Sequence, residues 1–107
     1  MTPLFVYGSL RRGRSNHHEL AHASFLGEAR TTGGYALVRI GDYPALVAGS
    51  DRVAGELYAV DAALLAELDA FEGEAYTRAL IELDDGRQAL AYLLRAPRGD
   101  EEAWQPI

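Results

Sequence analysis

The stretch DAALLAELDAFEG, residues 61–73, decides the fold class. Asp61 is a favourable N-cap residue, the residues after it are good or tolerable helix formers, and Gly73 offers a C-terminal stop. The stretch therefore predicts a helix from Ala62 to about Glu72. This is the one strongly predicted helix of the chain, so the sequence lacks the alternating strands and helices of a parallel α/β sheet.

Segments rich in aromatic and β-branched residues surround this helix and are typical of short strands. They cover residues 3–7, 25–28, 35–40, 53–60, 76–83 and 88–95, with a shorter segment at 45–48 after the break GDYP at 41–44. The Gly33-Gly34 turn separates two of these segments, and the DDGR stretch at 84–87 predicts a hairpin between the last two. Asn16 is expected to cap a helical turn from His17 to about Ala21, and the last dozen residues are expected to form a tail.

About six short strands and one main helix define an α+β fold class. We expect a small curled sheet, that is, a mixed β-barrel or part of one, with the helix packed alongside. The length of 107 residues, of which 49% are hydrophobic and 24% charged, is typical of one globular domain covering residues 1–107.

Composition excludes several function classes. The chain has 10 Arg, no Lys and 16 acidic residues, so no basic face is expected for nucleic acid. The absence of Cys excludes disulfides and sulfur metal ligands, and the absence of Lys excludes Schiff-base catalysis. The first apolar run, residues 3–7, is short and is followed by glycine and arginines. We therefore expect no signal peptide, no membrane span and a cytoplasmic location.

A helical wheel places one carboxylate among apolar side chains. At about 100° per residue, Leu64, Leu65, Leu68 and Phe71 share one face, which we expect to be buried, and Glu72 lies about 40° from Leu68. Glu72 is also in the last helical turn, where the helix dipole and partial desolvation both raise the pKa of a carboxyl group. A carboxyl group tuned in this way is suited to general acid/base catalysis near neutral pH.

A structural role for Glu72 is the alternative interpretation. A glutamate at a frayed helix end can turn to solvent or pair with a neighbour such as Arg78. The two interpretations predict different surroundings, because a catalytic Glu72 must lie inward and be available to a substrate.

The second candidate is the turn formed by Tyr7, Gly8, Ser9 and Leu10, directly after the first strand. Its successive backbone N–H groups could point into a concavity and bind a small anion such as a carboxylate. An ordinary turn is the alternative, since the segment lacks the spacing of a nucleotide-binding loop. The three arginines between residues 11 and 14 could attract an anionic substrate or simply be solvated.

Two further patterns carry little functional weight. His18 and His22 are four residues apart and suggest a metal site, but no His-Glu-x-x-His pattern or third ligand is evident, so we expect no metal. Ser9 does not lie in the Gly-x-Ser-x-Gly pattern of serine nucleophiles.

Several motifs together resemble one known family. They are FVYGSLRRG at 5–13 with NH at 16–17, VAGELY at 53–58, and LDAFEG at 68–73 followed by YTR at 76–78. Each motif is short, but their order and spacing over residues 4–95 are similar to those of the γ-glutamylcyclotransferase-like family.

The resemblance implies a small mixed barrel with a helix alongside, and an enzyme that converts a γ-glutamyl amine or γ-glutamyl amino acid into 5-oxoproline and a free amine. It implies that the backbone of the Tyr7–Leu10 loop holds the substrate's α-carboxylate and that Glu72 is the catalytic acid/base. Tyr43 or Tyr76 would shape the pocket wall. The reaction needs no metal or organic cofactor, and the expected partner is a small γ-glutamyl substrate, not nucleic acid or a membrane.

Two other functions stay open at this point. A related acyl-transfer or lyase enzyme acting on another amide would use the same carboxyl group. A non-catalytic binder of a small carboxylate metabolite would use the same pocket without turnover. The sequence indicates no particular oligomeric state.

Overall fold

A computed structural model describes residues 1–105 and confirms the predicted helix. The elements are β1 (Thr2–Val6), η1 (His17–Leu20), β2 (Ser24–Arg30), β3 (Tyr35–Ile40), β4 (Tyr43–Ala48), β5 (Ala54–Val60), α1 (Ala62–Glu72), β6 (Tyr76–Glu82) and β7 (Gln88–Leu94). The side chain of Asp61 accepts a hydrogen bond from the Leu64 N–H, as expected of an N-cap residue. Within the described range, no helix has the length and apolar character needed to cross a membrane.

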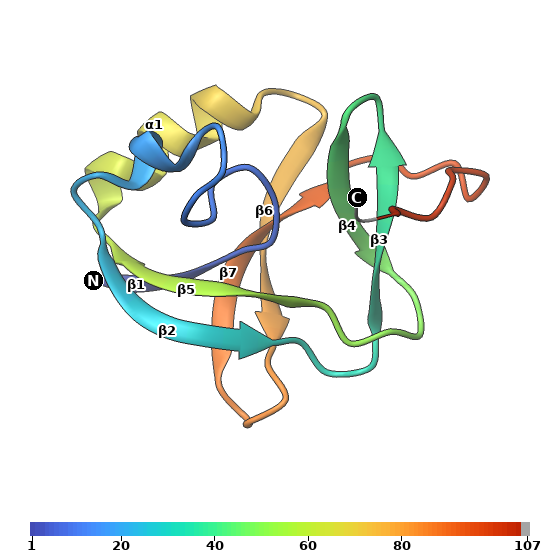
Figure 1. The fold of residues 1–107 in the computed structure, drawn as a ribbon, viewed down its shortest axis with the longest axis horizontal. Helices are drawn as coiled ribbons and strands as arrows, with labels where there is room; N and C mark the ends of the chain where they lie inside the picture. Colours follow the sequence, from blue (N-terminus) through green and yellow to red (C-terminus); the bar gives the residue numbers. More distant parts are fainter. Residues whose placement is uncertain (106–107) are drawn as a thin grey trace.

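The strands form one mixed sheet (Figure 1). Its order is β2-β5-β1-β7-β4-β3, and β6 pairs with β7 beside this path. β7 runs parallel to β1 and to β4, whereas the pairs β1–β5, β2–β5, β3–β4 and β6–β7 are antiparallel. The α+β class with one main helix is therefore confirmed, and the described residues hold seven strands where about six were expected.

The sheet curls but does not close into a continuous barrel. The last residues of β2 and β6 lead to an isolated bridge between Thr31 and Leu83, where the two edges of the curl meet. Backbone hydrogen bonds on either side of this bridge join Thr32 to Glu82 and Asp84 to Arg30. The expected barrel is thus a curled sheet joined at one corner.

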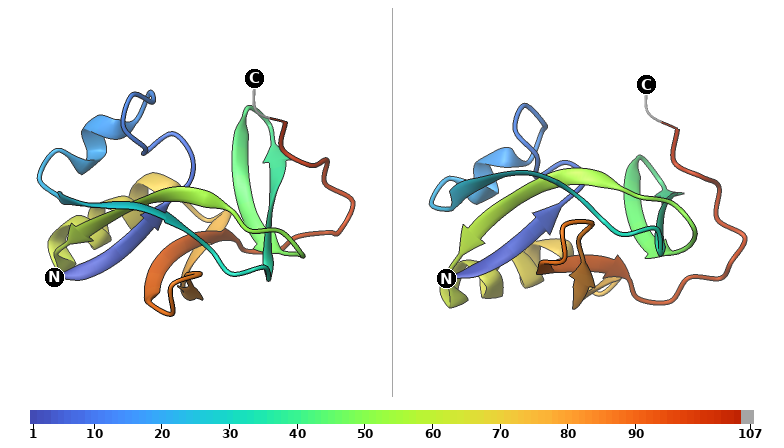
Figure 2. Two further views of the ribbon diagram at one scale, coloured as in Figure 1. Left: turned by 60° about the horizontal axis from the view of Figure 1, so that its bottom comes forward. Right: turned by 90° about the horizontal axis from the view of Figure 1, so that it is seen from below.

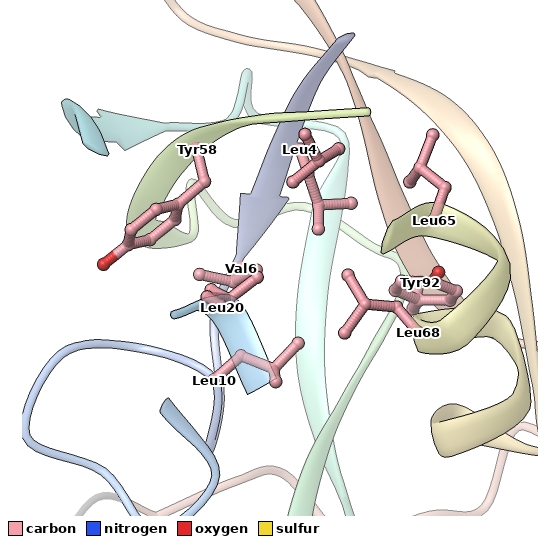
Figure 3. Close-up of a cluster of buried hydrophobic side chains, with 9 residues drawn as sticks. Leu4, Val6, Leu10, Leu20, Tyr58, Leu65, Leu68 and Tyr92 are labelled. Carbon is pink, nitrogen blue, oxygen red and sulfur yellow. The ribbon is translucent and has the colours of Figure 1, made fainter. Parts of the chain in front are cut away.

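Two apolar clusters stabilise this arrangement. Leu65 and Leu68 of α1 pack against Leu4 and Val6 of β1, and Leu10 and Leu20 complete that side (Figure 3). The second cluster lies inside the curl and includes Phe5, Leu46, Leu57, Ile81 and Leu83. Alternate residues of β1 thus enter different clusters, as expected for a strand covered on both faces.

Two connections can be compared with the sequence-based expectation. The Gly33-Gly34 turn separates β2 from β3 as expected, and these two strands do not pair with each other, since β2 pairs with β5 and β3 pairs with β4. The break expected at GDYP, residues 41–44, is shorter than predicted and consists of residues 41–42. Ile40 already pairs with Tyr43 across this turn, in which Gly41 has φ 59°. A short turn that needs one left-handed residue therefore replaces the longer break.

The C-terminal tail is attached to the sheet. Ala103 forms a bridge with Val38, and the Arg39 N–H donates to the Glu102 carbonyl at 2.7 Å. β3 is otherwise an edge strand with unpaired backbone groups, and the tail covers this edge. Both views of Figure 2 show the β3–β4 hairpin at one end of the molecule and the N terminus at the other.

Candidate active site

A cavity of about 350 Å³ lies between the loop after β1, the C-terminal end of α1 and the β3–β4 hairpin. These elements occupy the upper part of the view in Figure 1. The cavity is lined by all seven residues that the sequence singled out: Tyr7, Gly8, Ser9, Leu10, Tyr43, Glu72 and Tyr76. Segments far apart in the sequence are therefore brought to one site.

Glu72 is the last residue of α1 and is half-buried in the cavity wall. Burial raises the pKa of its carboxyl group from 4.5 to about 7. Within residues 1–105, its oxygens have no hydrogen-bond or ion-pair partner, and no fully buried side-chain oxygen is left unpaired. The carboxyl oxygens of Glu72 are therefore accessible, and a molecule in the cavity can reach them.

Arg78 does not pair with Glu72. Its Nη1 atom lies 3.2 Å from Oδ1 and 3.1 Å from Oδ2 of Asp69. The hydroxyl of Tyr92 also donates to Asp69, at 2.7 Å, and burial together with this hydrogen bond raises the pKa of the tyrosine. Arg78 is thus paired with Asp69, so the alternative interpretation in which Arg78 pairs with Glu72 does not apply.

The loop of residues 7–10 uses its carbonyl groups and leaves its amides free. The Gly8 carbonyl accepts from the N–H and the Nε of Arg11, both at 3.1 Å. The Ser9 carbonyl accepts from the Asn16 N–H at 3.0 Å, and the Leu10 carbonyl contacts His17 Nδ1 at 2.9 Å. In the described part of the chain, the N–H groups of Gly8, Ser9 and Leu10 have no acceptor. Three successive free amides are what an anion-binding nest requires.

Asn16 has a role that the sequence interpretation missed. It precedes η1 as expected, but its side chain forms no cap bond. Its Nδ2 instead donates to Ser9 Oγ at 2.8 Å, and both residues line the cavity. Because Ser9 Oγ accepts this bond, its own proton is available to another acceptor.

The three tyrosines of the predicted site differ in their surroundings. The hydroxyl of Tyr7 is buried and committed, since it donates to the Tyr92 carbonyl and accepts from the Leu46 N–H at 3.2 Å. Tyr76 is half-buried, and its pKa is raised by burial and by the nearby Glu72. Tyr43 is 52% exposed at the cavity mouth. Tyr76 and Tyr43 are therefore the two that can offer polar or aromatic contacts to a ligand.

Phe71 corrects the helical-wheel prediction. The wheel placed it on the buried face, but it is 41% exposed and lines the cavity beside Glu72. The two buried residues of α1 are Leu65 and Leu68. The apolar face of α1 is therefore buried at Leu65 and Leu68 but opens on the cavity at Phe71.

Gly8 allows the loop to approach the β3–β4 hairpin. A Cβ atom at this position would lie 3.2 Å from Cγ of Pro44, which also lines the cavity. A larger side chain would crowd this contact. Proximity to the hairpin therefore accounts for glycine in the loop.

The arginines after the loop do not line this cavity. Arg11 lies in a separate open groove with Glu56, and the guanidinium of Arg12 stacks 3.9 Å from the ring centroid of Phe25. The η1 turn ends at Leu20, so His22 shares no helix with His18. No group of three or more potential metal ligands is found among residues 1–105.

The curled mixed sheet, its single packed helix and the acid-bearing cavity define a small α+β domain with a site suited to proton transfer. The chain matches the family described as "Gamma-glutamyl cyclotransferase, AIG2-like" over residues 4–106. It belongs to this family.

Relatives and a solved structure agree with this assignment. The γ-glutamylcyclotransferase family protein YtfP of Escherichia coli is 42% identical over 96 residues, which are 88% of this chain and 83% of that protein. The γ-glutamylaminecyclotransferase of Bos taurus is 43% identical over 82 residues, which are 67% of this chain but 49% of that protein. The crystal structure of an AIG2-like protein from Mus musculus has a TM-score of 0.78 at 28% identity and covers 98% of this chain and 88% of that chain.

Proposed function

We propose that this protein is a γ-glutamylcyclotransferase that releases 5-oxoproline and a free amine from a γ-glutamyl amide, with Glu72 as the general acid/base. The observation that carries the proposal is the carboxyl group of Glu72, which is half-buried, has no partner among the described residues and opens on the cavity. A group with a pKa of about 7 can both accept and return a proton near neutral pH. The names of the Escherichia coli and bovine relatives also support the reaction class.

The reaction joins two atoms of one substrate. The Glu72 carboxylate takes a proton from the α-ammonium group, and the freed α-nitrogen attacks the γ-carbonyl carbon to close the five-membered ring. The bond from this carbon to the leaving nitrogen then breaks as Glu72 returns its proton to that nitrogen. The α-nitrogen loses two protons in total. The first reaches the leaving nitrogen through Glu72, and the second, released as the ring nitrogen becomes an amide, is taken up by the departing amine, which is therefore released as its ammonium ion.

The loop of residues 7–10 would hold the substrate in the cyclising conformation. Its free N–H groups at Gly8, Ser9 and Leu10 are suitable donors for the α-carboxylate or for the oxyanion that develops on the γ-carbonyl. The hydroxyl of Ser9, with its oxygen held by Asn16, is a further donor. Fixed donors of this kind cost little reorganisation during the reaction.

The test compares Glu72→Gln with the parent protein on a panel of γ-glutamyl amines, γ-glutamyl amino acids and glutathione, with 5-oxoproline measured by mass spectrometry. We expect Glu72→Gln to lose turnover by a factor of about 100 to 10,000, because an amide cannot accept the α-ammonium proton. Glu74→Gln is the matched control, since Glu74 is exposed two residues further along and does not line the cavity.

The outcomes separate the remaining functions. Equal activity of Glu72→Gln and the parent contradicts the assigned role of the carboxyl group. Amide cleavage without 5-oxoproline indicates a related acyl-transfer or hydrolytic enzyme. A folded protein that binds 5-oxoproline in calorimetry and turns over none of the panel is a carboxylate binder.

A further inference from the structure

Arg11 is a partly buried cation that the proposed chemistry does not use. It follows the 7–10 loop in the sequence but does not line the active-site cavity, and it lies instead in a separate open groove of about 470 Å³ that Glu56 also lines. Among residues 1–105 its guanidinium has no ion-pair partner. Burial and the nearby charge of Arg14 lower the pKa of this group, which still stays protonated at neutral pH. A buried cation without a carboxylate must be stabilised by another polar group.

The group that stabilises Arg11 is the carbonyl of Gly8. The Nε of Arg11 donates to this oxygen at 3.1 Å, and the backbone N–H of Arg11 donates to it at the same distance. A carbonyl group and the N–H of the next residue belong to one conjugated peptide group. Two donors on the oxygen, one of them charged, therefore draw electron density from the Ser9 nitrogen and make the Ser9 N–H a stronger donor. Arg11 thus acts on the loop from outside the cavity.

A second peptide group extends this arrangement. The carbonyl of Leu10 lies 2.9 Å from Nδ1 of His17, and because a carbonyl oxygen only accepts, Nδ1 carries the proton of this bond. The same peptide group contains the Arg11 N–H that donates to Gly8. Bonds aligned in one chain polarise one another in the same direction. The chain that starts at His17 ends at the Ser9 N–H, which has no acceptor among the described residues.

We infer, on the basis of the proposed function, that Arg11 is a positioning residue that fixes and polarises the Gly8–Ser9 peptide group, so that the Ser9 N–H becomes a strong donor to an anionic group. Arg11 itself does not touch the ligand. A purely structural role, in which Arg11 only holds the loop in shape, has different consequences. Polarisation strengthens the binding of a charged ligand, whereas the shape of the loop affects charged and neutral ligands alike.

The first experiment measures the Ser9 N–H in the ligand-free protein, by solvent-exchange NMR of the isotope-labelled parent and Arg11→Met. Base-catalysed exchange removes the amide proton, so a free amide exchanges faster as it becomes more acidic. We expect Arg11→Met to slow the exchange of the Ser9 N–H by about threefold or more. The Leu10 N–H is the internal control, because the carbonyl of its peptide group accepts from the Asn16 N–H and not from Arg11.

Arg14→Met is the matched control variant. Arg14 is exposed, and its replacement removes one positive charge near Arg11 without removing a donor from the carbonyl of Gly8. Its Ser9 exchange rate should stay close to that of the parent. Equal exchange of the Ser9 N–H in the parent and Arg11→Met overturns the inference. Faster exchange of both the Ser9 and the Leu10 N–H in Arg11→Met also overturns it, because Arg11 would then only hold the loop in shape.

The second experiment compares two ligands that differ in charge. 5-Oxoproline carries a carboxylate, whereas 5-oxoprolinamide is neutral and of similar shape. In NMR titrations, Arg11→Met should weaken binding of 5-oxoproline by about fivefold to tenfold and binding of the amide by less than about twofold. Arg11→Gln keeps an N–H donor at the position of Nε without the charge and should recover part of the loss. An equal loss for both ligands, or an equal loss in Arg14→Met, contradicts the assigned role of Arg11.

The two experiments also distinguish this inference from the function on which it rests. Unchanged exchange of the Ser9 N–H in Arg11→Met, in a protein that still forms 5-oxoproline from γ-glutamyl amides, overturns the inference alone. The expected effects on exchange and on 5-oxoproline binding, in a protein that turns over no γ-glutamyl amide, support the role of Arg11 at an anion site and overturn the cyclotransferase.

Discussion

At the scale of single residues, Glu72 combines two opposed requirements. As a base it must be ionised, yet its burial in the cavity wall favours the neutral form and raises its pKa to about 7. Since no cation among the described residues offsets this burial, the ionised side chain costs stability. An unpaired carboxylate that destabilises the folded protein is better explained by a functional role than by a structural one.

This cost predicts a pH-dependent effect of Glu72→Gln on stability. The folded-state pKa of about 7 lies above the ordinary value of 4.5, so the folded state binds more protons between these values and the free energy of unfolding falls as pH rises through that window. Glutamine cannot ionise and avoids this loss. Urea denaturation should show Glu72→Gln to be about 1 to 2 kcal/mol more stable than the parent at about pH 8, with little difference at about pH 4. A variant that is less stable at both values argues against a desolvated carboxylate.

The same pKa predicts the pH profile of catalysis. The base form of Glu72 is depleted as pH falls below about 7, so kcat/KM for a γ-glutamyl amine should fall about tenfold per pH unit on the acid side and level off above this value. Initial rates of 5-oxoproline formation at low substrate concentration measure this profile. Glu74→Gln should leave it unmoved. A profile that is flat across the acid range is incompatible with Glu72 as the base.

At the scale of elements, the contact between β5 and β1 depends on one glycine. A Cβ atom on Gly55 would collide with the Val6 carbonyl oxygen and lie 2.6 Å from Cζ of Phe5. Gly55→Ala should therefore lower the free energy of unfolding by about 1 to 3 kcal/mol through overpacking. Gly33→Ala is the control, because a Cβ there meets nothing within 4 Å. Equal midpoints of thermal or urea unfolding for the two variants would falsify the close-contact explanation.

Elements set by local interactions could be predicted from the sequence, and pairings between distant segments could not. The bounds of α1 follow from Asp61 and Gly73, which act within one turn of the helix. The partner of β2 is β5, more than twenty residues away, and no nearby signal distinguishes it from β3. The attachment of Ala103 to Val38 depends equally on where the completed sheet leaves an open edge.

The candidate site divides in the same way. Glu72 and the Tyr7–Leu10 loop could be found because helical periodicity and a glycine after a strand are local patterns. The exposure of Phe71 could not, because it depends on the cavity that segments distant in the sequence form at the end of α1. The hydrogen bond from Asn16 to Ser9 could not be predicted, because an asparagine at this position is equally suited to cap the helical turn that follows.

At the scale of the whole molecule, β7 holds the parts of the site together. It pairs with β1, β4 and β6, so the strand before the loop, one strand of the hairpin and the strand that follows α1 share one neighbour. The buried hydroxyl of Tyr7 strengthens this junction through the Tyr92 carbonyl of β7 and the Leu46 N–H of β4. The cavity geometry therefore depends on the sheet keeping its curl.

The corner where the curl is joined gives a test of that dependence. Thr31 is fully buried, its Oγ1 donates to the Thr32 carbonyl at 2.8 Å, and it accepts from the Val53 N–H at 2.9 Å. Thr31→Val keeps the shape but leaves the buried Val53 N–H without this acceptor, so the free energy of unfolding should fall by about 1 to 3 kcal/mol. Thr32→Val is the control, because the bond of Thr32 to Glu82 uses its backbone N–H. If the corner supports the cavity, Thr31→Val should also weaken 5-oxoproline binding in calorimetry, and Thr31→Ser should restore it. A loss of stability at unchanged affinity for 5-oxoproline would show that the cavity does not depend on the corner.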